Sequence, residues 1–282
     1  MKHGWRIALI TTVPPVANAL VPVLRELGHD PVAIISARRR QPAPPGREPM
    51  GDETAPDGVD VLLARDKWSV EPLLRSSGPD LALCWGFPWR IPQSALDVPP
   101  LCSINCHPAM LPRHRGPIPL AWALRDGDGQ FGVTWHRMDA QLETGAILAQ
   151  APVPMLEDDF GIEVVGPRIG AAAIGLLPAV LARIAAGDPG DPQPTEGVTW
   201  AGHFGDDYAA VDWSQPARRI HDQVRAWAFT FDLSPVTGPI AEIDGKRVRL
   251  VRTSLSDPGR PDARRMETGD GPIWILEAQP VD

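Results

Sequence analysis

Short apolar segments alternate with segments of helical spacing throughout residues 6–106 of this 282-residue chain. Residues 6–12 read as a buried strand, and residues 16–27 carry apolar side chains at helical spacing up to Gly28, a residue typical of helix ends. The same rhythm predicts strands at 31–36, 59–64, 80–85 and 101–106, with a helix near 69–75. Such alternation implies right-handed crossovers and a mostly parallel sheet, so the pattern predicts an α/β fold.

The pattern changes character in the second half of the chain. A helix at 120–125, strands at 131–138 and 146–154, and a long amphipathic helix at 162–184 are predicted first. A stretch rich in Pro, Gly, Asp and Thr follows, and then one helix at 213–227 precedes short strands at 240–243, 247–254 and 273–278. We therefore predict a first domain at 1–187, a linker at 188–205 and a small, mostly β domain at 206–282.

Charge and cysteine usage narrow the class of protein. The formal net charge is −8, which argues against nucleic acid as the main partner, because phosphate binding needs a basic surface. Cys84, Cys102 and Cys106 are odd in number, lie in or beside predicted strands and form no CxxC pair, so neither a disulfide framework nor a zinc site is expected. The N-terminal residues contain no long apolar segment, and we expect a cytoplasmic protein without a membrane span.

Polar side chains gather where the strand at 101–106 ends. Asn105 and His107 are two residues apart, so both side chains leave the strand on one face, while Cys106 points the other way. The carboxyl ends of parallel strands are where open α/β sheets place ligands. An asparagine amide can donate to a developing oxyanion, and a histidine can donate or relay a proton. With a carboxylate such as Glu143 to orient the imidazole or take a proton, these groups suit acyl transfer to an amine.

The residues around this pair extend the pattern over about forty positions. They read Asn105, His107, Leu111, Pro112, Arg115, Gly116, then Trp122-Ala123-Leu124, Gly132-Val133-Thr134, Met138-Asp139 and Leu142-Glu143-Thr144-Gly145. In this order they resemble the N10-formyltetrahydrofolate-dependent formyltransferases. The segment from Val211 to Ala226 also resembles the start of the C-terminal domain in the methionyl-tRNA formyltransferase branch.

The resemblance implies a fold, a donor and a set of site residues. The fold is a Rossmann-like, mostly parallel sheet in the N-terminal domain with a smaller, mostly β, OB-like C-terminal domain. The formyl donor is N10-formyltetrahydrofolate, and no metal is required. The implied catalytic residues are Asn105, His107 and Glu143. The implied donor-binding residues are Phe87, Trp89, Arg90, Ile91 and Asp139.

Two positions depart from the family pattern. Ala109 stands where the family has serine, and Glu143 stands where it has its catalytic aspartate. Glutamate is one methylene longer, and a misplacement of about 1 Å can cost about a hundredfold in rate unless the backbone retreats. Glu143 is thus a relay in a resized site or a sign of altered activity. Asp139, four residues upstream, is either a substitute carboxylate or a turn residue.

The acceptor is the open question. Residues 206–282 hold ten basic and thirteen acidic side chains, a net charge of −3, whereas a domain that grips tRNA should be positive. The loop that matches the basic tRNA-binding loop of the methionyl-tRNA formyltransferase branch still contains four arginines: Arg38, Arg39, Arg40 and Arg47. We therefore expect a small primary amine of specialised metabolism, such as an amino acid, a hydroxylated diamine or an amino sugar. The second domain would shape the acceptor pocket or form a homodimer contact.

Three alternatives stay open. Formylation of initiator methionyl-tRNA would be indicated by salt-sensitive binding of tRNA. A hydrolase would release formate from the folate with no acceptor present. A folate-binding protein without catalysis is the third, and Glu143 is the residue that keeps it open.

Overall fold

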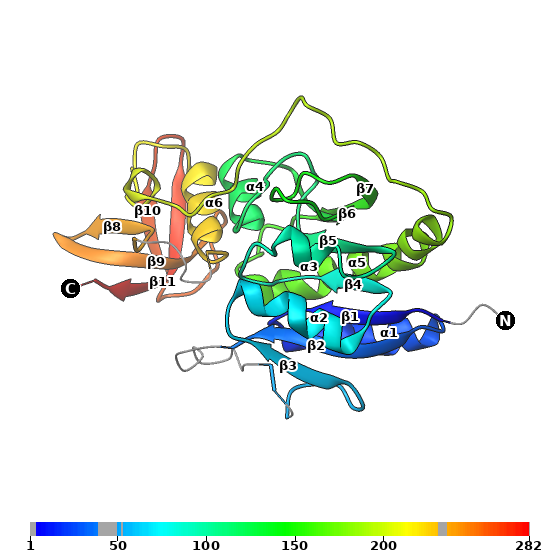
Figure 1. Ribbon diagram of the computed structural model, residues 1–282. Helices are drawn as coiled ribbons and strands as arrows, with labels where there is room; N and C mark the ends of the chain where they lie inside the picture. Colours follow the sequence, from blue (N-terminus) through cyan, green and yellow to red (C-terminus); the bar gives the residue numbers. More distant parts are fainter. Residues whose placement is uncertain (1–3, 39–49, 52, 231–235, 282) are drawn as a thin grey trace. The chain divides into compact units, whose positions relative to one another are not determined.

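The computed structural model describes residues 4–38, 50–51, 53–230 and 236–281 (Figure 1). The chain divides into two compact units. The first contains Met1–Pro112, Gly132–Ala151 and Ile169–Gly197; the second contains Arg113–Phe131, Pro152–Arg168 and Val198–Asp282. These units alternate along the chain, and the boundaries expected at 187 and 205 stay a prediction about sequence domains.

A seven-stranded sheet forms the first unit, in the order β3-β2-β1-β4-β5-β6-β7. Its strands are β1 (Arg6–Ile10), β2 (Asp30–Ala37), β3 (Asp60–Ala64), β4 (Leu81–Cys84), β5 (Cys102–His107), β6 (Gln130–Arg137) and β7 (Ile147–Pro154). The first five strands pair in parallel, and β6 runs antiparallel to β5. The predicted mostly parallel sheet is confirmed, and the reversal of strand order beside β1 marks the edge where such sheets bind ligands.

Short helices cover this sheet, and their ends follow local chemistry. Helix α1 (Pro14–Glu26) begins with proline. Proline lacks a backbone N–H, and this costs nothing at a helix start because the first N–H groups of a helix have no acceptor within the helix. Helix α2 (Val70–Ser77) ends at Gly78, which adopts a left-handed φ of 57°. Helices α2 and α3 (Gln93–Leu96) pack with β1, β2 and β4 in one buried apolar cluster. This cluster fixes the carboxyl end of β4, where the segment expected to hold the donor begins.

Helix α5 (Ile162–Ala185) is the long amphipathic helix predicted from the sequence. Among the described residues, this is the helix that is long and apolar enough to cross a membrane, a test that buried helices of soluble proteins also pass. Its buried side chains recur at helical spacing from Val165 to Ile184. Trp135 of β6 donates its indole N–H to the carbonyl of Ala173, 2.9 Å away. In the first unit, α5 thus packs against the sheet.

The second unit is built around a four-stranded antiparallel sheet, in the order β10-β11-β9-β8. Its elements are α4 (Pro119–Arg125), η2 (Asp206–Tyr208), α6 (Ala217–Trp227), β8 (Ile240–Ile243), β9 (Lys246–Ser254), β10 (Arg264–Glu267) and β11 (Pro272–Pro280). The mostly β domain is confirmed, although β10 was not predicted because its charged residues carry no apolar alternation. Asp244 and Gly245 both have positive φ, 52° and 71°, as a tight hairpin turn between β8 and β9 requires.

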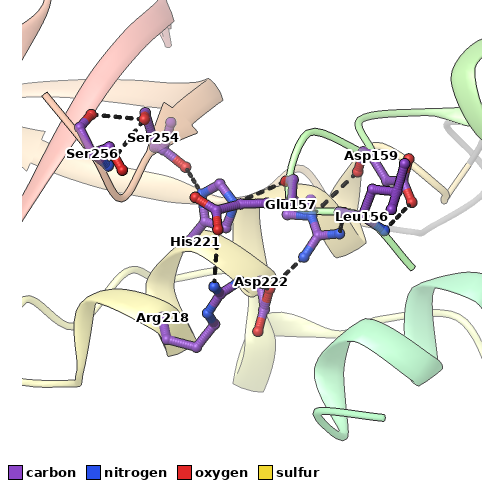
Figure 2. A network of polar contacts seen from close by, with 10 residues as sticks. Leu156, Glu157, Asp159, Arg218, His221, Asp222, Ser254 and Ser256 are labelled. Carbon is purple, nitrogen blue, oxygen red and sulfur yellow. Dashed lines mark hydrogen bonds and ion pairs between the residues drawn. The ribbon is translucent and has the colours of Figure 1, made fainter. Parts of the chain in front are cut away.

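A network of buried polar side chains ties α6 to residues 156–159 within the second unit (Figure 2). Arg225 donates to the carbonyls of Leu156 and Asp159 and to the carboxylate of Asp222. His221, fully buried, lies 2.9 Å from the hydroxyl of Thr253 and 3.2 Å from the carbonyl of Glu157. Because backbone carbonyls take most of these donors, the network holds a loop rather than facing a ligand.

Candidate active site

Strand β5 carries Asn105 and His107 at its carboxyl end, in the middle of the sheet. Asn105 lies opposite Cys84 of β4 and His136 of β6, and His107 lies opposite Thr134. Neighbouring strands on both sides fix the backbone here, so the two side chains project from a rigid base. His107 is 3% exposed, which is deep enough for its hydrogen bonds to be selective.

The structure brings Glu143 to His107 from the loop between β6 and β7. Oε1 of Glu143 lies 3.2 Å from Nδ1 of His107, and the two side chains are 12% and 4% exposed. At this distance Nδ1–H donates to the carboxylate, which fixes the ring orientation and favours a proton on that nitrogen. The carboxylate–imidazole pair expected from the sequence is therefore assembled in the first unit.

The backbone around Glu143 is held in an unusual position. Glu143 has a φ of 56°, in the left-handed region that residues other than glycine, asparagine and aspartate rarely adopt. Gln193 donates from Nε2 to the carbonyls of Glu143 and Gly145, both at 2.8 Å. A Cβ on Gly145 would lie 1.9 Å from the carbonyl oxygen of Arg137, so only glycine lets this turn lie against the end of β6. These restraints fix the backbone position from which the Glu143 side chain, one methylene longer than aspartate, reaches His107.

His136 is a site residue that the sequence did not single out. Its Nδ1 lies 2.8 Å from the carbonyl of Arg137, so Nδ1–H donates and Nε2 carries the lone pair. Nε2 lies 3.2 Å from Nδ2 of Asn105, which therefore donates to it. Burial lowers the pKa of His136 to about 4, and nearby His107 acts in the same direction. A neutral His136 thus fixes which end of the Asn105 amide faces it. Its position opposite Asn105 depends on strand pairing, which the sequence pattern does not reveal.

Asp139 lies in the same loop as Glu143, but its carboxylate holds the turn. It accepts from the hydroxyl of Thr144, at 2.7 and 2.8 Å, and from the backbone N–H of Gln141, at 2.9 Å. Of the two readings left open by the sequence, this geometry supports the turn residue. Its assignment to donor binding stays a prediction.

The segment expected to hold the donor follows β4. Phe87 and Trp89 form an edge-to-face pair with ring centroids 5.4 Å apart, and both pack partly on the apolar cluster under α2 and α3. Ile91 is buried in that cluster, whereas Arg90 is exposed. The buried side chain of Ile91 therefore anchors the segment. Their role in donor binding is a proposal.

All three cysteines are unpaired, and burial raises their pKa values. The pKa of Cys84 rises to about 12, mainly through burial and further through the negative charge of Glu143. A thiol with such a pKa stays protonated at neutral pH and is a poor nucleophile. Among the residues that the structure describes, no three His, Cys, Asp or Glu side chains are grouped as a metal site.

Comparison with known proteins identifies the family to which the chain belongs. The family model for formyl transferase matches residues 3–181, and the model for the formyl transferase C-terminal domain matches residues 206–282. A methionyl-tRNA formyltransferase from Burkholderia orbicola (strain MC0-3) is 31% identical over 266 residues, covering 89% of this chain and 78% of its own length. The resemblance noted in the sequence is thereby confirmed.

Solved structures share the fold at lower identity. HypX from Aquifex aeolicus, crystallised with tetrahydrofolic acid, has a TM-score of 0.69 at 20% identity and covers all of this chain, which matches 45% of HypX. An N-formyltransferase from Helicobacter canadensis, in complex with folinic acid and dTDP-3-aminofucose, has a TM-score of 0.69 at 14% identity and covers 98% of this chain and 99% of its own. At these identities the likeness shows the fold alone.

Proposed function

The chain belongs to the formyl transferase family, and on that premise we propose that it transfers a formyl group from N10-formyltetrahydrofolate to the primary amine of a small molecule. The observation that carries the proposal is the grouping of the Asn105 amide, the His107 imidazole and the Glu143 carboxylate at the end of β5. The donor supplies the formyl carbon, whose bond to N10 breaks as its bond to the amine nitrogen forms.

Each of the three side chains has a role in that exchange. Negative charge grows on the formyl oxygen, and the amide N–H of Asn105 suits its stabilisation; removing one such donor typically costs about 10²–10³ in rate. The amine must lose a proton, which the Glu143–His107 pair can accept and deliver to the leaving N10. Phe87 and Trp89 offer apolar ring faces beside β4 for a pterin.

The acceptor is proposed to be small because the sequence that forms most of the second unit is acidic. Residues 206–282 carry ten basic against thirteen acidic side chains, and the chain as a whole has a net charge of −8. A tRNA phosphate backbone is bound through a positive surface. We therefore favour an amine from specialised metabolism, and a cytoplasmic location stays a prediction.

Initiator tRNA is the second candidate acceptor. It is favoured by the methionyl-tRNA formyltransferases that are about a third identical to this chain. Of the basic loop that would contact tRNA, Arg38 is described, while Arg39, Arg40 and Arg47 lie outside the described residues.

The deciding experiment supplies N10-formyltetrahydrofolate with a pool of primary amine metabolites and, in a parallel reaction, with initiator methionyl-tRNA. Mass spectrometry should detect the gain of one formyl group on a member of the amine pool, and Glu143→Gln should lower its rate of formation by at least about a hundredfold. Formylated methionyl-tRNA alone would transfer the assignment to the tRNA branch. Formate released without any acceptor would indicate a hydrolase, and no turnover under any condition would refute the enzyme proposal.

A further inference from the structure

Residues 188–193, the first part of the predicted linker, lie along the edge of the seven-stranded sheet. Asp191 and Ile147 of β7 exchange two backbone hydrogen bonds of 2.8 Å, as paired residues of antiparallel strands do. Arg137, the last residue of β6, donates from Nη2 to the carbonyl of Asp188, 2.7 Å away. This edge segment, residues 188–193, is thus part of the first unit.

The edge segment is also held by an arginine of α5 and by a glycine. Nε of Arg183 lies 2.7 Å from the Asp188 carboxylate, and its Nη1 lies 2.8 Å from that of Asp191. Hydrogen bonds from Arg183 hold the pKa of both carboxyl groups below their usual range, so both pairs are charged at neutral pH. A Cβ on Gly190, whose φ is 89°, would lie 2.9 Å from the carbonyl oxygen of Ile147, so glycine is what allows this close approach.

Gln193 ends the edge segment and binds the loop between β6 and β7. Its Nε2 donates to the carbonyls of Glu143 and Gly145, each at 2.8 Å. These carbonyls belong to the turn in which Glu143 has its left-handed φ of 56°, and Oε1 of Glu143 lies 3.2 Å from Nδ1 of His107. One amide therefore fixes two carbonyls of the turn that carries the proposed proton acceptor.

A second glutamine has the same arrangement in the second unit. Nε2 of Gln223 donates to the carbonyls of Tyr208 and Ala210, at 2.9 and 3.0 Å. Neither carbonyl belongs to a residue proposed for catalysis or donor binding. Gln223 is therefore a matched control for the loss of two hydrogen bonds from one side-chain amide.

We propose that Gln193 is a positioning residue that acts through Glu143: its amide, held by the edge segment, fixes the turn from which the carboxylate reaches His107. The inference rests on the proposed function, because the position of Glu143 affects turnover only if its carboxylate takes part in the reaction. A glutamate in the left-handed region is strained and persists only where its surroundings hold it. Without the two bonds the turn relaxes, and a shift of about 1 Å at a reacting group can cost about a hundredfold in rate.

Replacement of each glutamine by methionine removes both donors and keeps an unbranched side chain of similar length. We expect kcat of Gln193→Met to fall by about tenfold or more, with the KM for N10-formyltetrahydrofolate unchanged. Gln223→Met should leave kcat per folded molecule unchanged. Steady-state kinetics on the acceptor that the protein formylates measures both. An unchanged kcat in Gln193→Met, or an equal loss in the two variants, would overturn the proposal.

A double-mutant cycle separates positioning from a merely structural role. In the Glu143→Gln protein, the further change Gln193→Met should lower kcat by less than about twofold, because the carboxylate that it positions is already gone. Gly190→Ala, which pushes the edge segment away from β7, should likewise lower kcat in the unsubstituted protein and not in Glu143→Gln. A loss of similar size in both backgrounds would show that Gln193 acts independently of Glu143 and would contradict the proposal.

NMR spectroscopy can observe the carboxylate–imidazole pair without turnover. The Nδ1 proton that His107 donates to Glu143 lies on a residue that is 3% exposed, so it should give a slowly exchanging signal in protein labelled at histidine nitrogen. The signal, identified by its absence in His107→Gln, should be lost in Gln193→Met and retained in Gln223→Met. Its retention in Gln193→Met would refute the positioning role. If the unsubstituted protein formylates no acceptor, the proposed function fails, and this signal alone decides whether Gln193 places Glu143.

Discussion

Two buried histidines, one in each unit, use the same chemistry for different ends. His136 donates through Nδ1 to the carbonyl of Arg137 and accepts the Asn105 amide at Nε2. His221 has the opposite tautomer: Nε2 donates to the carbonyl of Glu157 and Nδ1 accepts the hydroxyl of Thr253. Burial lowers the pKa of both rings to about 4. Each ring is therefore neutral and locked by one backbone carbonyl.

The difference lies in what the second nitrogen holds. His221 orients the hydroxyl of Thr253, near the carboxyl end of β9, and lies in a network that ends largely on backbone carbonyls (Figure 2). His136 orients an amide at the end of β5, beside a carboxylate–imidazole pair. A buried neutral histidine is thus a fixed acceptor in either unit, and the two rings differ in the group that they orient: a hydroxyl in the second unit and the amide of a proposed catalytic residue in the first. The following predictions compare matched residues in the two settings.

The largest effect is expected from the carboxylates. Glu143→Gln removes the carboxylate beside His107 that we propose as proton acceptor, and kcat should fall by about 10²–10⁴. Glu157→Gln in the second unit, where the carboxylate meets Arg218 in solvent, should change kcat less than twofold. Steady-state kinetics on the identified amine would check both. Equal losses in the two variants would contradict the separation of roles.

The next largest effects are expected from Asn105 and Thr253, the side chains that are hydrogen-bonded to His136 and His221. Asn105→Ala removes the amide that we propose as a donor to the formyl oxygen, and we expect a loss in kcat of about 10²–10³. Thr253→Val leaves kcat unchanged but removes one buried hydrogen bond, which costs about 1 kcal/mol of unfolding free energy. Kinetics and urea titration on both proteins separate these outcomes. A stability loss in Asn105→Ala larger than in Thr253→Val would weaken its catalytic assignment.

Acid should destabilise both units through these rings. The folded-state pKa of about 4 lies below the unfolded value of 6.5, so the unfolded chain binds protons first as the pH falls. Each histidine then removes about 2 kcal/mol of unfolding free energy between pH 7 and pH 5. His221→Phe should reduce the loss of unfolding free energy between pH 7 and pH 5 by about 2 kcal/mol, as measured by urea titration at both pH values. An unchanged slope would mean that His221 is already protonated in the folded protein.

The smallest effect on turnover is expected at His136 itself. His136→Phe frees the Asn105 amide to rotate, and we expect kcat to fall by about tenfold with the KM for the donor unchanged. His221→Phe is the matched control, with unchanged kcat per folded molecule and a loss of stability of about 1–3 kcal/mol. A merely structural His136 would behave like this control.

The outline of the fold and the central residues followed from local sequence. The alternation of short apolar segments with helical segments predicted the parallel sheet. A strand that is buried on both faces of such a sheet needs a continuous apolar sequence, as in β1 and β4. The Asn105–His107 spacing placed both side chains on one face for the same geometric reason. Strand β10 was not predicted, since its pairing with β11 rather than its own residues makes it a strand.

What the sequence determined by itself is the family, the sheet and the identity of the polar groups, because period, spacing and residue type are local properties. What only the tertiary structure decided is their mutual placement. The 3.2 Å contact between Glu143 and His107 depends on a left-handed backbone and on the clamp from Gln193, fifty residues away. The pairing of His136 with Asn105 depends on strand register. Both are set by packing of the whole unit, which no short stretch of sequence encodes.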